Sequence, residues 1–186
     1  MLDRRHVLAC AGGAAIVATA GILAWPRSAL GFGPVSLRQS RAAALQHLGP
    51  GALTSKLCGG VDGTLYSVRD PGFVTDAGEA IPAMAMFGTG NGSVSEIQAS
   101  LSWPNGGMEL DDWQKLVTAQ ERELARRIGA SQRSATRSQD ALGIEVEHTF
   151  VAADAVVQLR SRWMQRSGAA FSRIHWLAAG EKSVIA

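Results

Sequence analysis

The sequence is poor in cysteine and has no surplus of charge in its main part, and each shortage excludes a class of protein. Cys10 and Cys58 are its only cysteines, which excludes a disulfide scaffold, a four-Cys zinc site and a Cys-ligated iron–sulfur cluster. Residues 32–186 carry 15 basic and 15 acidic side chains, because the first 31 residues hold three of the 18 basic and one of the 16 acidic ones. A neutral domain has no basic footprint for nucleic acid.

Catalytic motifs are also absent from the sequence. It contains no G-x-S-x-G, S-x-x-K or H-E-x-x-H, patterns that supply a nucleophile or a metal-bound base. No known motif surrounds Cys58, so we expect it to be a small buried apolar residue. These absences favour a non-enzymatic protein without a cofactor or metal, and they leave the question of activity open.

The N-terminal segment carries the clearest signal. Arg4 and Arg5 precede residues 7–25, which contain no charge, and Arg4-Arg5-His6-Val7-Leu8 resembles the twin-arginine motif of the bacterial Tat export pathway. The small residues Ala29 and Gly31 occupy the −3 and −1 positions of a cleavage after Gly31. Residues 1–31 are therefore predicted to be a Tat-like signal peptide.

The same segment raises two other possibilities, a lipid-attachment site and a retained membrane anchor. Val7-Leu8-Ala9-Cys10 looks like a lipobox, but it precedes the apolar core instead of closing it, which excludes lipid attachment at Cys10. A retained membrane anchor stays open, because 19 uncharged residues nearly reach the ~20 that a span requires. Either way, residues 32–186 form one domain outside the inner membrane, periplasmic, secreted or anchored, and only residues 1–31 touch the membrane.

Two capping boxes predict helices in this domain. Residues 36–39 read Ser-Leu-Arg-Gln and would open a helix that ends at Gly49-Pro50. Residues 111–114 read Asp-Asp-Trp-Gln and would open an amphipathic helix that runs to Ile128, with Gly129 as C-cap.

Apolar and polar residues alternate in several other segments, which is typical of strands with one wet face. The predicted strands are 64–69, 80–87, 94–103, 144–151, 155–164 and 171–178. Val94 falls out of register and suggests a bulge near Ser95. Residues 130–140 are polar and predict a mobile loop. The expected fold class is α+β: a two-layer sandwich of order α-β-β-β-α-β-β-β, with an antiparallel sheet and two amphipathic helices on one face.

Four residues of the predicted strands are catalytic candidates. His148 and His175 would approach each other if the last strands pair, and Glu145 and Glu147 share the opposite face of the strand that holds His148. A metal site needs three or four converging ligands, and no H-x-x-x-H spacing occurs, so ordinary strand histidines are the simpler interpretation.

The binding candidates are Trp163 and two arginines near it. Arg162 and Arg166 flank it at the end of a long predicted strand. An exposed tryptophan among arginines would suit a partner surface.

The sequence therefore favours an exported, non-enzymatic accessory or binding domain of the bacterial cell envelope, with another envelope protein or a small ligand as its partner. The alternatives are a small Tat-exported hydrolase or metal-handling protein that uses the histidines, and a membrane-tethered subunit of an envelope complex.

Overall fold

The computed structural model describes residues 30–56, 62–75, 77–103, 107–129, 132–183 and 185. Arg4, Arg5, Ala29 and the rest of residues 1–29 lie outside the described residues, as does Cys58. Within the described ranges, no helix is both long enough and apolar enough to cross a membrane.

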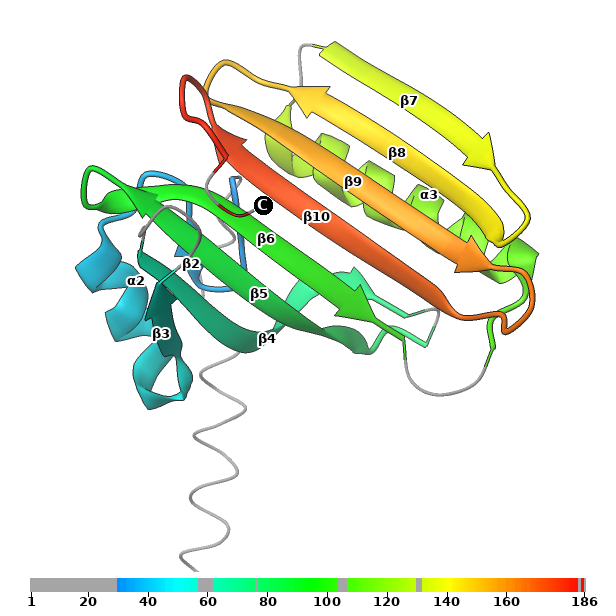
Figure 1. The fold of residues 1–186 in the computed structure, drawn as a ribbon, viewed down its shortest axis with the longest axis horizontal. Helices are drawn as coiled ribbons and strands as arrows, with labels where there is room; N and C mark the ends of the chain where they lie inside the picture. The colour runs from blue at the N-terminus through cyan, green and yellow to red at the C-terminus, as the bar shows by residue number, and fades with distance from the viewer. Residues whose placement is uncertain are drawn as a thin grey trace, which may run out of the picture.

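One antiparallel sheet of eight strands dominates the fold (Figure 1). Its spatial order is β3-β4-β5-β6-β10-β9-β8-β7, so two four-stranded meanders meet where β6 pairs with β10. The strands are β3 (Leu53–Lys56), β4 (Asp62–Val74), β5 (Ala80–Gly90), β6 (Ser93–Ser102), β7 (Gln132–Gln139), β8 (Gly143–Val151), β9 (Ala155–Met164) and β10 (Ala170–Ala178).

The remaining elements are short, apart from one helix. A two-stranded hairpin, β1 (Gly31–Phe32) and β2 (Val35–Ser36), precedes helix α2 (Arg41–Leu48) and the 3-10 turn η1 (Gly49–Gly51). Helix α3 (Leu110–Ile128) connects the two meanders.

The predicted fold class, an α+β two-layer sandwich with two amphipathic helices on one face, is wrong. The described chain is mostly β, and only α3 is a long amphipathic helix, because α2 buries Ala44 alone. The order α-β-β-β-α-β-β-β missed β3 and β7, which form the two edges of the sheet. Residues 132–139, predicted to lie in a mobile loop, are β7. Their sequence shows no alternation because residues 133–139 are exposed on both faces of the strand.

Several local predictions are confirmed. The last three predicted strands correspond to β8, β9 and β10. Gly88 pairs with Glu96 and Thr89 with Val94, which leaves Ser95 as the extra residue of a bulge. Gly129 closes α3 in the left-handed conformation, with φ of 56°.

Both predicted helix starts are displaced. Arg38 has a positive φ of 63°, so the chain still turns there, and α2 begins only after Ser40, whose Oγ accepts a hydrogen bond from the Ala43 amide at 3.2 Å. Helix α3 begins one residue before the predicted capping box, after Glu109, which makes no side-chain capping bond.

One face of the sheet is covered. Helix α3 lies behind β8, β9 and β10 in Figure 1 and buries Trp113, Leu116, Val117 and Leu124. Beside it, Phe32 of the β1–β2 hairpin packs against the rings of Phe73 in β4 and Trp176 in β10, with centroids 5.4 and 5.6 Å away. We call this side the covered face.

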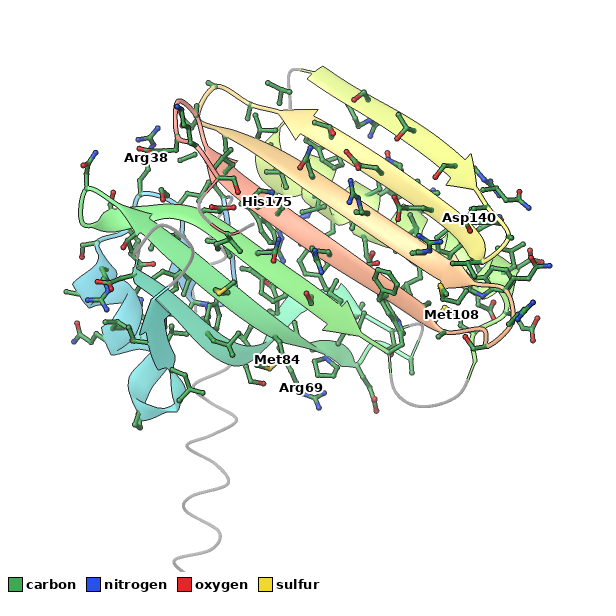
Figure 2. The ribbon with its side chains drawn as sticks, in the orientation of Figure 1. Arg38, Arg69, Met84, Met108, Asp140 and His175 are labelled. Atoms are coloured by element: carbon green, nitrogen blue, oxygen red, sulfur yellow. The ribbon has the colours of Figure 1, made fainter. Side chains whose placement is uncertain are left out.

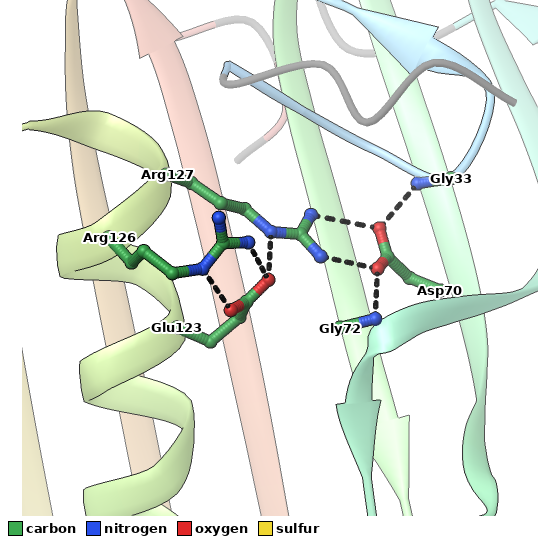
Figure 3. A network of polar contacts seen from close by, with 6 residues as sticks. All are labelled: Gly33, Asp70, Gly72, Glu123, Arg126 and Arg127. Carbon is green, nitrogen blue, oxygen red and sulfur yellow. Dashed lines mark hydrogen bonds and ion pairs between the residues drawn. The ribbon is translucent and has the colours of Figure 1, made fainter.

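A buried ion pair joins the two parts of the covered face (Figure 3). Arg127 of α3 donates to both carboxylate oxygens of Asp70 in β4, at 2.5 and 3.0 Å, and the side chains are only 3% and 5% exposed. The amides of Gly33 and Gly72 also donate to Asp70, each at 2.9 Å. Glu123 accepts from Nε of Arg127 at 2.7 Å. The hairpin, β4 and α3 are thus tied together by one carboxylate.

This ion pair explains two further features. Burial alone would raise the pKa of Asp70, but the hydrogen bonds and charge of Arg127 and the two glycine amides outweigh it and hold the pKa below its ordinary value. Gly72 has no room for a Cβ, because that atom would overlap the guanidinium of Arg127 and the carboxylate of Glu123. Arg127 is therefore a buried structural residue.

The opposite side of the sheet is largely uncovered by the described residues, and we call it the open face. Figure 1 is viewed onto it. Met84 and Phe171 stand on this face at 48% and 42% exposure. Ser183 and Ile185 lie at one end, where the Ile185 amide donates to Glu96 at 2.9 Å. A sheet with one dry and one wet face explains the alternation in β6, β9 and β10.

The predicted cleavage point is part of the folded domain. Gly31 is buried in β1 opposite Ser36, and the carbonyl of Leu30 accepts a hydrogen bond from the Leu37 amide at 2.9 Å. Cleavage after Gly31 in the folded protein would therefore require the β1–β2 hairpin to open.

Candidate ligand-binding site on the open face

A shallow depression of about 130 Å³ lies near the centre of the open face, on the four strands around the junction of the meanders. Its polar lining is supplied by β6, β10, β9 and β8. The lining residues are Gln98, Glu147, Gln158, Arg160, Arg173 and His175. Figure 2 shows the side chains of this face and labels His175 among them.

The strand register explains why these six side chains meet. Gln98, His175 and Gln158 are direct cross-strand partners and form one row. Arg173 and Arg160 are partners in the next row, which Glu147 extends on β8. Residues two apart in a strand share a face, so the rows lie side by side. An amide–imidazole–amide row thus borders an arginine–arginine–carboxylate row.

The two arginines of the depression have different surroundings. Arg160 donates to Glu147 Oε2 at 2.7 and 3.1 Å, and this hydrogen bond raises the pKa of Arg160. Arg173 is exposed and has no ion-pair partner among the described residues. Like charges directly opposite each other destabilise a sheet, so the Arg173–Arg160 pair is unfavourable. Carboxylates of the chain neutralise the charge of Arg160, and none of the described carboxylates neutralises that of Arg173.

His175 is held by a buried carboxylate. Its Nε2 lies 2.5 Å from Oε1 of Glu96, a side chain that is 0% exposed. Ser183 Oγ donates to the same Oε1 at 2.7 Å, and the Ile185 amide donates to Oε2 at 2.9 Å. These contacts orient the imidazole beside the depression and fasten Ser183 and Ile185 to the sheet.

The structure does not bring the catalytic candidates together. His148 pairs with Leu159 on the covered face, whereas His175 stands on the open face. Burial lowers the pKa of His148, Glu121 opposes this effect from 3.9 Å, and Arg133 adds to it. No hydroxyl or thiol of the described residues hydrogen-bonds to the His175 ring, so it has no nucleophile to activate there.

Glu145 and Glu147 do share the open face, as their spacing predicts, but both act as ion-pair partners. Glu147 is bound to Arg160, and Glu145 lies 3.7 Å from both Arg160 and Arg162. Across the described ranges, no group of three or more His, Cys, Asp or Glu side chains is arranged to hold a metal ion.

The three binding candidates around Trp163 do not form one surface. Trp163 packs with Trp113 and Ile144 on the covered face, and its indole N–H donates to the Met108 carbonyl at 2.7 Å. Arg162 points to the open face and donates to Asp140 at 2.6 Å. Arg166 is exposed in the turn after β9. The tryptophan therefore serves packing, and none of the three residues lines the depression.

Sequence reasoning missed Arg160, Arg173, Gln98 and Gln158. Each occupies a solvent-facing position of an alternating strand. The alternation predicts that these side chains are exposed, but it does not predict that they lie close to one another. The β6–β10 pairing, which joins residues 69 to 81 positions apart, and the β9–β10 pairing bring them together.

No protein-family model, curated protein or solved structure matches this chain. Its function has to be inferred from its own residues.

Proposed function

We propose that the chain is an exported, non-enzymatic binding domain of the bacterial cell envelope, and that the depression on the open face binds a small anionic ligand. The observation that carries this proposal is the direct opposition of Arg173 and Arg160 in an exposed depression, with no carboxylate on Arg173 among the described residues. A bound carboxylate or phosphate would relieve the repulsion and accept hydrogen bonds from the free guanidinium.

The neighbouring side chains fit such a ligand. Gln98 and Gln158 can each donate from an amide, and His175 is oriented by Glu96. Glu147 repels an anion, but Arg160 neutralises it at 2.7 Å. The volume of about 130 Å³ is suited to a single phosphate or a short dicarboxylate.

Calorimetric titration of the purified protein with inorganic phosphate and with succinate tests the site. Arg173→Gln should weaken binding by roughly tenfold or more, since a hydrogen bond to a charged group contributes about 1.5–3 kcal/mol. Arg166→Gln, in an exposed turn outside the depression, is the matched control and should bind like the parent protein. Equal binding by Arg173→Gln and the parent protein, or no binding of either anion at millimolar concentration, would contradict the proposed anion site.

Export is proposed from residues 1–31 and needs its own test. Changing Arg4 and Arg5 both to lysine should leave a tagged protein in the cytoplasmic fraction if the Tat pathway carries it. Unchanged export of that variant would contradict the Tat interpretation without affecting the binding site. N-terminal sequencing of the exported protein distinguishes a cleaved signal from a retained anchor, which is the form that a tethered subunit requires.

A further inference from the structure

The edge strand β7 has the properties of a docking strand. All eight of its residues pair continuously with β8, without a bulge, and the strand contains neither proline nor glycine. The opposite edge, β3, has only four residues. Exposed edges are usually shortened, bulged, covered or interrupted by proline, and β7 shows none of these devices among the described residues. Within the described part of this edge, Arg133 and Arg137 are the features that would oppose pairing.

The turn after β7 shows which backbone groups are free. Asp140 donates its amide to the Gly143 carbonyl at 3.0 Å, so these two residues form a hydrogen-bonded pair. Hydrogen-bonded pairs alternate along an antiparallel ladder. Ser134, Thr136 and Ser138 therefore bond to β8, whereas residues 133, 135, 137 and 139 direct their N–H and C=O groups away from the sheet.

The side chains of β7 add a charge preference. Arg133 and Arg137 lie on the same side of the strand, four residues apart, and residues 132–139 include no acidic residue. Arg133 lies 3.1 Å from Glu121 of α3, and Arg137 has no ion-pair partner among the described residues. Both are exposed. A strand added at this edge would place its own side chains beside the arginines, where opposite charges stabilise the pairing.

Charge also decides between the possible occupants. A second copy of β7 would bring four arginines onto one two-stranded edge, and like charges in adjacent strands repel. A segment with acidic residues four positions apart would instead meet Arg133 and Arg137 with opposite charge. We propose that β7 binds an extended, acidic segment of a partner protein by strand addition. This inference is independent of the anion site on the open face.

Two labelled peptides test the proposal by fluorescence polarisation. The probe TEITVEIT carries glutamate at positions 2 and 6, on one face of an extended chain, and its control carries lysine at both positions. The glutamate peptide should bind to the full chain at least tenfold more tightly than the lysine peptide. Equal binding of the two would overturn the charge argument.

A backbone variant tests the strand itself. Proline at position 135 removes an N–H that points away from β8, so Ala135→Pro should keep the melting temperature near that of the parent while it abolishes peptide binding. Arg166→Gln should leave binding unchanged. Hydrogen exchange adds a readout that does not depend on the variant: the peptide should slow exchange of amides 133, 135, 137 and 139. Protection elsewhere, or concentration-dependent dimers joined through β7, would overturn the proposal.

Discussion

Arg127 on the covered face and Arg173 on the open face both belong to the one sheet domain, but only Arg127 has its charge met by the described part of the chain. Arg127 is 3% exposed and bound to Asp70 and Glu123. Arg173 is exposed, lies opposite another arginine and has no carboxylate partner among the described residues. A buried charge with carboxylate partners indicates a structural role. An exposed arginine that faces another arginine and has no carboxylate partner is instead available to bind an anionic ligand.

The largest expected effect comes from breaking the buried pair. Arg127→Met should lower the free energy of unfolding by about 3–5 kcal/mol, because Asp70 would stay buried without its cation. Denaturant unfolding measures the loss. Arg126→Gln is the matched control on the next residue, and it should change stability little because Arg126 is exposed. A mild effect of Arg127→Met would contradict the structural role assigned to the pair.

Acid should weaken the covered face through the same carboxylate. Because the folded-state pKa of Asp70 is below its unfolded value, its contribution to stability is present above the unfolded value and is lost as pH falls through the folded one. The unfolded value is about 3.9. Unfolding curves measured from pH 6 to pH 2.5 should show this loss. Asp70→Asn should flatten the curve in that range, and an unchanged pH profile in this variant would contradict the prediction.

A smaller effect is expected where the backbone approaches the ion pair. Gly72→Ala should destabilise the protein by roughly 1–3 kcal/mol, because the new methyl group overlaps Arg127 and Glu123. Apart from its chain neighbours, no heavy atom of the described residues lies within 4 Å of a methyl group added at Gly51, so Gly51→Ala is the matched control and should be close to neutral. Equal melting temperatures for the two variants would show that the ion pair can shift.

The smallest effect on stability is expected on the open face. Arg173→Gln removes a like-charge opposition and should change the free energy of unfolding by no more than about 0.5 kcal/mol, with a gain favoured over a loss. Thermal melting of this variant beside Arg127→Met measures the contrast between the faces directly. A large loss of stability in Arg173→Gln would assign Arg173 a structural role as well.

Local patterns in the sequence predicted much of the sheet but not its extent. Alternation identified β8, β9 and β10, where one face is buried. It could not identify β7, since residues 133–139 of that strand are exposed on both faces and no apolar period is required.

The site and the buried pair depend on contacts between distant residues, which a local pattern does not contain. Arg127 and Asp70 are 57 residues apart, and the helix sequence alone does not show which of its charged residues is buried. The sequence assigned both histidines to strands but did not show that they lie on opposite faces of the sheet. Which face each one occupies depends on the register of β8, β9 and β10.

The binding role of the open face is tested most directly by following the backbone amide resonances of the purified protein during a titration with inorganic phosphate. We expect saturable shifts in the two rows that line the depression, residues 98, 175 and 158 and residues 173, 160 and 147, and we expect these shifts to be lost in Arg173→Gln. Shifts confined to other parts of the molecule, or shifts that persist in Arg173→Gln, would contradict it.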